Sequence, residues 1–185
     1  WMRCGRHGNT LDSRLQILCR NRLMIEVKIT PELIQRARKK TATVGNLQGS
    51  ITGSLSHVVG AIGEIIVADA IGADESNTYD YDLVRDGERI DVKTKRCNTR
   101  PFPHYDCSVA AHGTKQDCDS YVFVRILTDS SRAWILGSIP KQDFYTKATK
   151  HRRGDVDPAN GFTFKADCYN LQISELSDVK KSISI

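Results

Sequence analysis

The sequence has no run of about 18 consecutive apolar residues, the length of a membrane helix, and its first residues lack the apolar segment of a secretory signal. These absences argue against a membrane span and against export, so we expect an intracellular, cytoplasmic protein with no membrane partner. The six cysteines include no Cys-x-x-Cys pair and no regular spacing, which argues against a zinc ribbon and a disulfide framework. We interpret them as free thiols.

Little of the positive charge lies in the body of the chain. The formal net charge is +5, but residues 1–23 hold five arginines against one aspartate, which leaves +1 for residues 24–185. We interpret residues 1–23 as a tail, either non-native or disordered, and residues 24–185 as a single domain. Basic clusters remain at 36–40, 93–100 and 147–153. Such clusters are common on solvated surfaces, but three in one small domain are also suited to the phosphates of a nucleic acid.

Apolar residues at helical spacing predict two helices in the first half of the chain. Thr30 followed by Pro31 is typical of a helix start, so we expect a helix over 31–41. A second helix is expected over 55–71, where apolar residues recur every three or four positions. A polar, Gly- and Ser-rich loop over 43–54 connects the two.

The rest of the chain is richer in strand signals. Asp86-Gly87 predicts a β-hairpin between strands at 78–84 and 89–95. Further strands are expected at 107–111, 120–127 and 132–139. Beyond these we expect a short helix over 141–150, an exposed loop over 151–161, and a last strand or the start of a helix over 169–176. This order of elements indicates a mixed α/β domain built on a central sheet.

The strand predicted at 89–95 has two faces of different chemistry. Side chains alternate along a strand, so the apolar side chains point to one face, which we expect to be core. Asp91, Lys93 and Lys95 point to the other face, which we expect to be polar. The hairpin brings Asp82 near Asp91. Two crowded carboxylates need a cation between them or a neighbouring lysine, and a divalent metal ion would satisfy both.

An acidic residue on a helix, an aspartate on the next strand, and an Asp-x-Lys strand follow one another in this sequence. They are Glu64 in GAIGEIIVADAIG, Asp82 in YDYDL, and Asp91 with Lys93 in IDVK. Their order and spacing resemble the PD-(D/E)XK nuclease superfamily, and the resemblance covers residues 60–127. Many members carry a further Gln or Lys on the following element.

The resemblance has one gap and one ambiguity. Tyr81 stands where the family pattern has proline before its first aspartate, a departure that is frequent in the superfamily. Asp80 lies two residues from Asp82, on the same face of the strand, and competes for its role. Gln116 in HGTKQDCDSY is the candidate for the additional Gln or Lys.

The resemblance implies a restriction-endonuclease-like fold, with a mixed central β-sheet flanked by helices. It also implies hydrolysis of DNA phosphodiester bonds with Mg²⁺, for which Mn²⁺ would substitute. The metal ligands that it implies are Asp82, Asp91, Glu64 and the peptide carbonyl of Val92. Lys93 would assist the attacking water or the transition state, and Gln116 would complete the catalytic set.

The expected partner is DNA, with RNA as an open alternative. The basic residues assigned to nucleic-acid contacts are Lys95, Arg96, Arg100 and Lys115. An endonuclease is favoured over an exonuclease, and a homodimer is expected where both strands are cut. The alternative function is a non-catalytic nucleic-acid-binding module that keeps the nuclease fold. The carboxylates favour the enzyme, because a binding module has no use for their mutual repulsion.

Aromatic residues and histidines near the expected site receive no catalytic role. For Tyr79, Phe102 and Tyr105 we favour core packing over stacking on bases. The loop over 98–106 follows the Asp-x-Lys strand directly, so we expect it on the substrate side. No histidine has a partner at ligand spacing, which leaves three of them unassigned: His57, His104 and His112.

Overall fold

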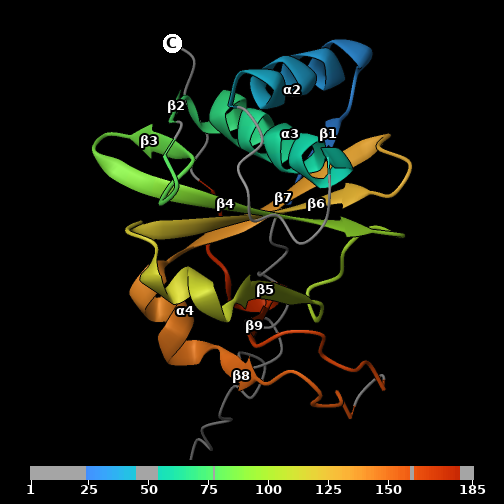
Figure 1. The fold of residues 1–185 in the computed structure, drawn as a ribbon, viewed down its shortest axis with the longest axis vertical. Coiled ribbons are helices and arrows are strands. Elements are labelled where there is room, and N and C mark those ends of the chain that lie inside the picture. The colour runs from blue at the N-terminus through green and yellow to red at the C-terminus, as the bar shows by residue number, and fades with distance from the viewer. Residues whose placement is uncertain (1–23, 45–53, 77, 159–160, 180–185) are drawn as a thin grey trace, which may run out of the picture.

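The computed structural model describes residues 24–44, 54–76, 78–158 and 161–179 of the chain. Its central sheet is made of β1 (Ile25–Lys28), β2 (Asp74–Glu75), β3 (Leu83–Arg85), β4 (Glu88–Cys97), β6 (Ser120–Leu127) and β7 (Arg132–Pro140). The six strands lie in the order β1-β7-β6-β4-β3-β2 (Figure 1). Only β4 and β6 pair in parallel, so the sheet is mixed.

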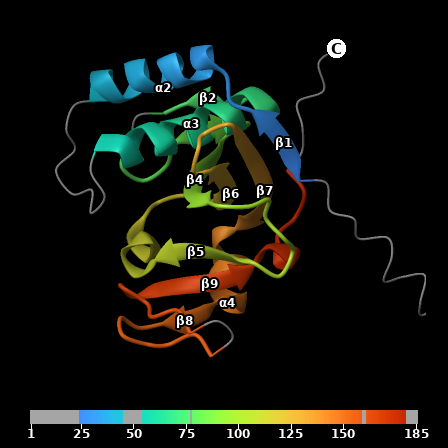
Figure 2. The ribbon, with the colours of Figure 1, turned by 90° about the vertical axis from the view of Figure 1, so that its right-hand side faces the viewer.

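Two helices cover one face of this sheet, and a second, smaller sheet with a third helix covers the other. The helices are α2 (Pro31–Val44), α3 (Ser54–Ile71) and α4 (Lys141–Lys147). The small sheet is made of β5 (Asp106–Ala110), β9 (Cys168–Gln172) and β8 (Thr149–His151), in that order. Figure 2 shows α2 and α3 above the central sheet, and the small sheet with α4 below it. The predicted α/β fold, a mixed central sheet flanked by helices, is confirmed.

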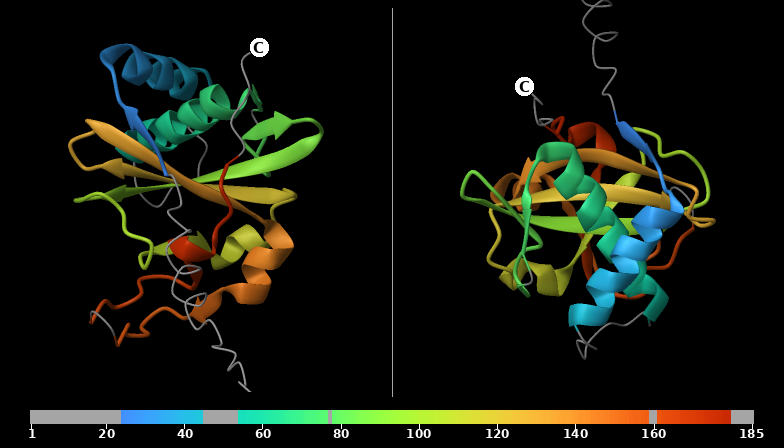
Figure 3. Two further views of the ribbon diagram at one scale, coloured as in Figure 1. Left: turned by 180° about the vertical axis from the view of Figure 1, so that it is seen from behind. Right: turned by 90° about the horizontal axis from the view of Figure 1, so that it is seen from above.

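The two predicted helices are present, and their ends follow from local chemistry. Thr30 caps α2, because its Oγ1 accepts a hydrogen bond from the backbone N–H of Leu33 at 3.3 Å. Gly72 follows the last residue of α3 at φ +67°, a left-handed conformation that ends a helix. Between residues 59 and 71 most of α3 is buried, because this part lies between α2 and the sheet (Figure 3).

The predicted hairpin is also present, and its short first strand matters for the site. Asp86 and Gly87 both have positive φ, at 51° and 83°, as a two-residue hairpin turn requires. β4 pairs with β6 from Ile90 to Cys97, but with β3 only from Glu88 to Ile90. Within the described residues no strand continues along that edge, so the second half of β4 has one unpaired side.

Several elements were missed or misplaced by the sequence pattern. The strands β1 and β2 were not predicted, and β8 takes residues that we expected in the helix over 141–150 and the loop over 151–161. The region 169–176 divides into β9 and a short 3-10 helix, η2 (Ile173–Glu175). These short strands depend on partners far along the chain, which periodicity does not report.

Three other expectations have a structural outcome or lie outside the described residues. Cys97, Cys107, Cys118 and Cys168 form no disulfide, as expected, whereas the two remaining cysteines lie in the undescribed tail 1–23. Most of the loop predicted at 43–54 is likewise undescribed. In the ranges that the structure describes, no helix is long and apolar enough to cross a membrane.

Candidate active site

The Asp-x-Lys face of β4 is turned toward the small sheet, and at Asp91 it is not solvated. Asp91 is 4% exposed, and its register partner on β6 is the fully buried Tyr121. Lys93 is the register partner of the buried Phe123. The expectation of a polar face was wrong at Asp91, although Lys95 on the same face is exposed. Alternation fixes which way a side chain points but not what covers it. Asp91 is therefore buried, with Tyr121 beside it on β6 and Lys93 in contact with it.

Lys93 is held between an acidic and an amide side chain. Its Nζ lies 2.5 Å from Asp91 Oδ2, and it donates a hydrogen bond of 2.9 Å to Gln116 Oε1. The ammonium also lies 5.8 Å from the centre of the Tyr121 ring. The backbone carbonyl of Gln116 accepts a hydrogen bond from Lys141 Nζ, which fixes the segment that carries this glutamine. The structure thus brings together three of the predicted catalytic residues.

The Asp91 carboxylate is incompletely satisfied. Its contact with Lys93 is short but lacks the angles of a hydrogen bond, so Oδ2 is buried without a hydrogen-bond partner among the described residues. Buried carboxylate oxygens normally accept hydrogen bonds, whereas in the described residues this oxygen has only its contact with the Lys93 ammonium. Asp91 Oδ2 is therefore a candidate metal-binding atom.

Asp82, and not Asp80, reaches this site. Asp82 lies one residue before β3, where its backbone N–H bonds to the carbonyl of Ile90 at 3.0 Å. Its Oδ2 accepts a hydrogen bond of 2.7 Å from the backbone N–H of Val92, on the unpaired edge of β4. Asp80 instead accepts a 3.3 Å hydrogen bond from the backbone N–H of Asp117. Of the two aspartates, Asp82 is the one that lies against β4 beside Asp91.

Three carboxylates gather at this point of the sheet. Burial raises the pKa of Asp82 well above its usual value, and the charges of Glu64 and then Asp91 raise it further. The hydrogen bond from Val92 opposes this shift, but it does not outweigh the other causes. The carboxylates of Glu64 and Asp91 therefore lie near enough to Asp82 for their charges to act on it.

Glu64 comes from α3 and has a partner that sequence reasoning missed. Lys40 of α2 places its Nζ 2.7 Å from Glu64 Oε2 and 2.5 Å from Glu75 Oε2. Burial lowers the pKa of Lys40, but the two carboxylates outweigh burial and raise it overall. The only signal in the sequence was the basic cluster 36–40, which does not reveal a partner on another element. Glu64 is thus less available to a metal ion than Asp82 or Asp91.

Oxygen donors suited to Mg²⁺ are present at this site. In the described part of the chain, no set of three histidine, cysteine, aspartate or glutamate side chains is arranged to hold a metal ion as it stands. Mg²⁺ keeps several waters and needs only one or two carboxylates from a protein, which Asp82 and Asp91 supply. In an extended strand the carbonyl and N–H of a residue point the same way, so the Val92 carbonyl faces the side of β4 where Asp82 lies. The donor set fits this ion.

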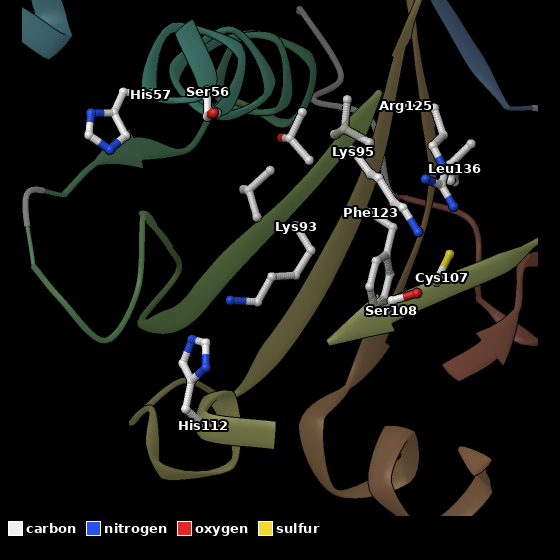
Figure 4. Close-up of a pocket in the computed structure, with 14 residues that line it drawn as sticks. Ser56, His57, Lys93, Lys95, Cys107, Ser108, His112, Phe123, Arg125 and Leu136 are labelled. Atoms are coloured by element: carbon white, nitrogen blue, oxygen red, sulfur yellow. The ribbon is translucent and has the colours of Figure 1, made fainter. Parts of the chain in front are cut away.

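The residues assigned to nucleic-acid contacts do not form one surface. Lys95 lines a cleft of about 490 Å³ beside the carboxylates, together with Lys93 (Figure 4). Arg96 is exposed on β4, and Lys115 is exposed in the 3-10 helix η1 (Ala111–Lys115). Arg100 is exposed after the end of β4. Hydrogen bonds from Arg132 and Trp134 lower the pKa of the Glu26 carboxyl on β1, and the charge of Arg100 has a smaller effect in the same direction. Of the four, Lys95 is the one beside the carboxylates.

The aromatic residues near the site are not core residues. Tyr79 is 78% exposed, Phe102 is 49% exposed, and Tyr105 is also exposed. Phe102 stacks on His104 with ring centres 5.7 Å apart, and Tyr105 meets both rings edge-on. The expectation of core packing was wrong for all three. The loop 98–106 instead presents an aromatic cluster to solvent.

Comparison with models of known protein families and with curated protein sequences finds no match for this chain. Its chemistry therefore has to be argued from the site itself.

Proposed function

We propose that this protein is a metal-dependent nuclease that hydrolyses DNA phosphodiester bonds, with a site of the PD-(D/E)XK type in a restriction-endonuclease-like fold. One observation carries the proposal. Glu64, Asp82 and Asp91 converge from a helix and a hairpin, and Lys93 contacts Asp91 within the same group. Acidic residues are crowded in this way where a cation is to be bound, since their repulsion is otherwise a cost to the fold.

Each residue has a role that follows from its position. Asp82, Asp91 and the carbonyl of Val92 would hold Mg²⁺ or Mn²⁺, with Glu64 orienting a water from the helix side. The bound ion would polarise the phosphate and acidify the attacking water. Lys93 is placed to position that water or to neutralise charge developing on the phosphate.

Gln116 supports Lys93 and does not need to touch the phosphate. Its Oε1 accepts a hydrogen bond from Lys93 Nζ, which directs the ammonium together with Asp91. An ammonium held on two sides loses less conformational entropy when it binds a substrate. Gln116 is therefore a positioning residue in this proposal.

A binding module without turnover is the alternative from another class. Such a module has no use for a buried aspartate whose Oδ2 has no hydrogen bond in the described structure. The raised pKa of Asp82 likewise reflects a cost at neutral pH that a bound cation would remove. Both observations favour the enzyme. Cutting both strands of a duplex would require two such sites, which a homodimer would supply.

Two aspartates two residues apart allow a matched test. Purified protein is incubated with linear, circular, single-stranded and four-way-junction DNA, and with RNA, in Mg²⁺, Mn²⁺ or EDTA. We expect metal-dependent cleavage by the parent and by Asp80→Asn, and none by Asp82→Asn. A parent that binds DNA but cleaves none of these substrates would establish the binding module instead. Equal loss of cleavage in both variants would show that Asp82 has no role that Asp80 lacks.

A further inference from the structure

The cleft beside the carboxylates lies along the unpaired edge of β4. Its walls come from α3, the 3-10 helix η1 and β5, and the buried Phe123 and Leu136 are among its lining residues (Figure 4). Lys93 lines it together with His112, and Lys95 lies farther along the same strand. The cleft therefore begins at the proposed catalytic lysine and continues along β4, away from the β3 hairpin.

The cleft is lined by cationic side chains and by no acidic one. Among its described lining residues are Lys93, Lys95 and Arg125, with two histidines, and neither aspartate nor glutamate. Lys93 already has Asp91 as a partner. The excess positive charge therefore comes from Lys95 and Arg125.

Lys95 and Arg125 are like-charged neighbours that form no ion pair among the described residues. They are register partners on the parallel strands β4 and β6, so their side chains leave the same face side by side (Figure 4). Within the described residues, neither forms an ion pair with an acidic side chain. Arg125 is only 8% exposed, and its printed hydrogen bond goes to the backbone carbonyl of Asp106.

Such an arrangement is unfavourable unless an anion is bound. A guanidinium stays charged in a protein, and a buried charge without a partner is costly. Burial lowers the pKa of Lys95, and repulsion from Arg125 lowers it further. The Asp106 carboxylate acts on both cations, but it lies beyond ion-pair distance. A planar guanidinium beside an ammonium matches the oxygens of a phosphate group.

We infer that this cleft binds a phosphate group of the polynucleotide between Lys95 and Arg125. Lys95 is four residues from Asp91 on β4, about 13 Å at the rise of a strand. The bound phosphate is thus a different one from the phosphate that is cleaved, and it fixes the strand across the catalytic residues. That the phosphate belongs to a polynucleotide rests on the proposed function, whereas phosphate binding itself does not.

Inorganic phosphate is the first probe, in EDTA so that no cleavage takes place. The Nε–Hε signal of Arg125 in a ¹⁵N-labelled sample should shift saturably as phosphate is added. Lys95→Gln, which changes a partly exposed side chain, should weaken this binding about tenfold or more. Lys165→Gln is the matched control, because it removes the same charge from an exposed position outside the cleft. An Arg125 signal that does not respond, or equal weakening in both variants, would overturn the inference.

Oligonucleotide binding then tells which phosphate is held. Lys95→Gln should reduce the salt dependence of log K by about 0.7 for a single strand or about 0.9 for a duplex, and Lys165→Gln should not. The same oligonucleotide is compared with a 5′-phosphate and with a 5′-hydroxyl. A preference for the 5′-phosphate that disappears in Lys95→Gln identifies a terminal phosphate, whereas equal weakening of both oligonucleotides identifies an internal phosphodiester. A salt dependence unchanged in Lys95→Gln would refute polynucleotide binding at this cleft.

The failure of this inference is distinct from the failure of the nuclease proposal. If phosphate binds at Arg125 but the protein cleaves no nucleic acid, the phosphate subsite is supported and the nuclease proposal is refuted. Metal-dependent cleavage without an Arg125 response would retain the nuclease and refute the subsite.

Discussion

Gly63 sets the distance between α3 and β4, and thereby the position of Glu64. A Cβ at residue 63 would lie 3.0 Å from Thr94 Cβ and 3.1 Å from its Cγ2, and closer still to its Oγ1. Such separations are too short for packed carbon atoms, so Gly63→Ala must push the helix and strand apart or twist Thr94 out of its rotamer. Gly60, one turn earlier, offers a control: its Cβ would have Glu64 Oε1 as nearest neighbour, at an ordinary 3.9 Å.

The two substitutions should have different effects on the free energy of unfolding. Replacing glycine by alanine inside a helix stabilises by about 0.5–1 kcal/mol, which is the expectation for Gly60→Ala. Gly63→Ala gains the same amount but suffers overpacking of about 1–3 kcal/mol. It should therefore be less stable than Gly60→Ala by about 1–3 kcal/mol. For a chain of this length each kcal/mol corresponds to about 2–4 °C in melting temperature.

Urea unfolding of the parent and both variants measures this difference, provided that the m-value stays constant. Thr94→Ala should partly rescue Gly63→Ala, because it removes Oγ1 and Cγ2 and leaves the close Cβ. It should cost little by itself, since Thr94 Oγ1 is buried without a hydrogen bond in the described residues. Cleavage should fall in Gly63→Ala, as Glu64 moves away from Asp82, and recover in part in the double variant. If Gly63→Ala proved as stable as Gly60→Ala, the close packing of helix and strand described above would be incorrect.

Three further predictions concern the charges. The raised pKa of Asp82 contributes stability that is complete below its unfolded pKa and is lost as pH rises through its folded pKa. Asp82→Asn should therefore melt above the parent in EDTA, by a margin that grows as pH rises above about 4. Added Mg²⁺ should stabilise the parent more than this variant, and a margin independent of pH would contradict the assigned cause. Lys93→Ala should lower kcat about 10²- to 10⁴-fold, with little change in Mn²⁺ affinity measured by calorimetry. Near-normal turnover would show that Lys93 takes no part in the mechanism. Deletion of residues 1–23 should leave the melting temperature and cleavage unchanged. It should weaken binding to non-specific duplex DNA at low salt, because five arginines are lost. A shortened chain that does not fold would show that this segment is structural.

Local sequence determined the elements whose chemistry lies within a few residues. Thr30 with Pro31 marks a helix start by satisfying backbone N–H groups, and Asp86-Gly87 marks a hairpin by tolerating positive φ. The hairpin and the Asp-x-Lys spacing were enough to predict that Asp82 lies near Asp91. These features depend on backbone geometry at short range, which the residue types themselves encode.

The tertiary structure alone decided what surrounds those residues. Lys40 of α2 forms an ion pair with Glu64, and Arg125 of β6 lies beside Lys95. Only long-range packing brings these elements alongside one another. Asp91 proved to be buried because the small sheet, formed by segments from 106 to 172, closes over its face of β4. Because side chains alternate along a strand, the sequence predicts which of them point the same way. Whether that side faces water or another layer depends on how distant segments pack.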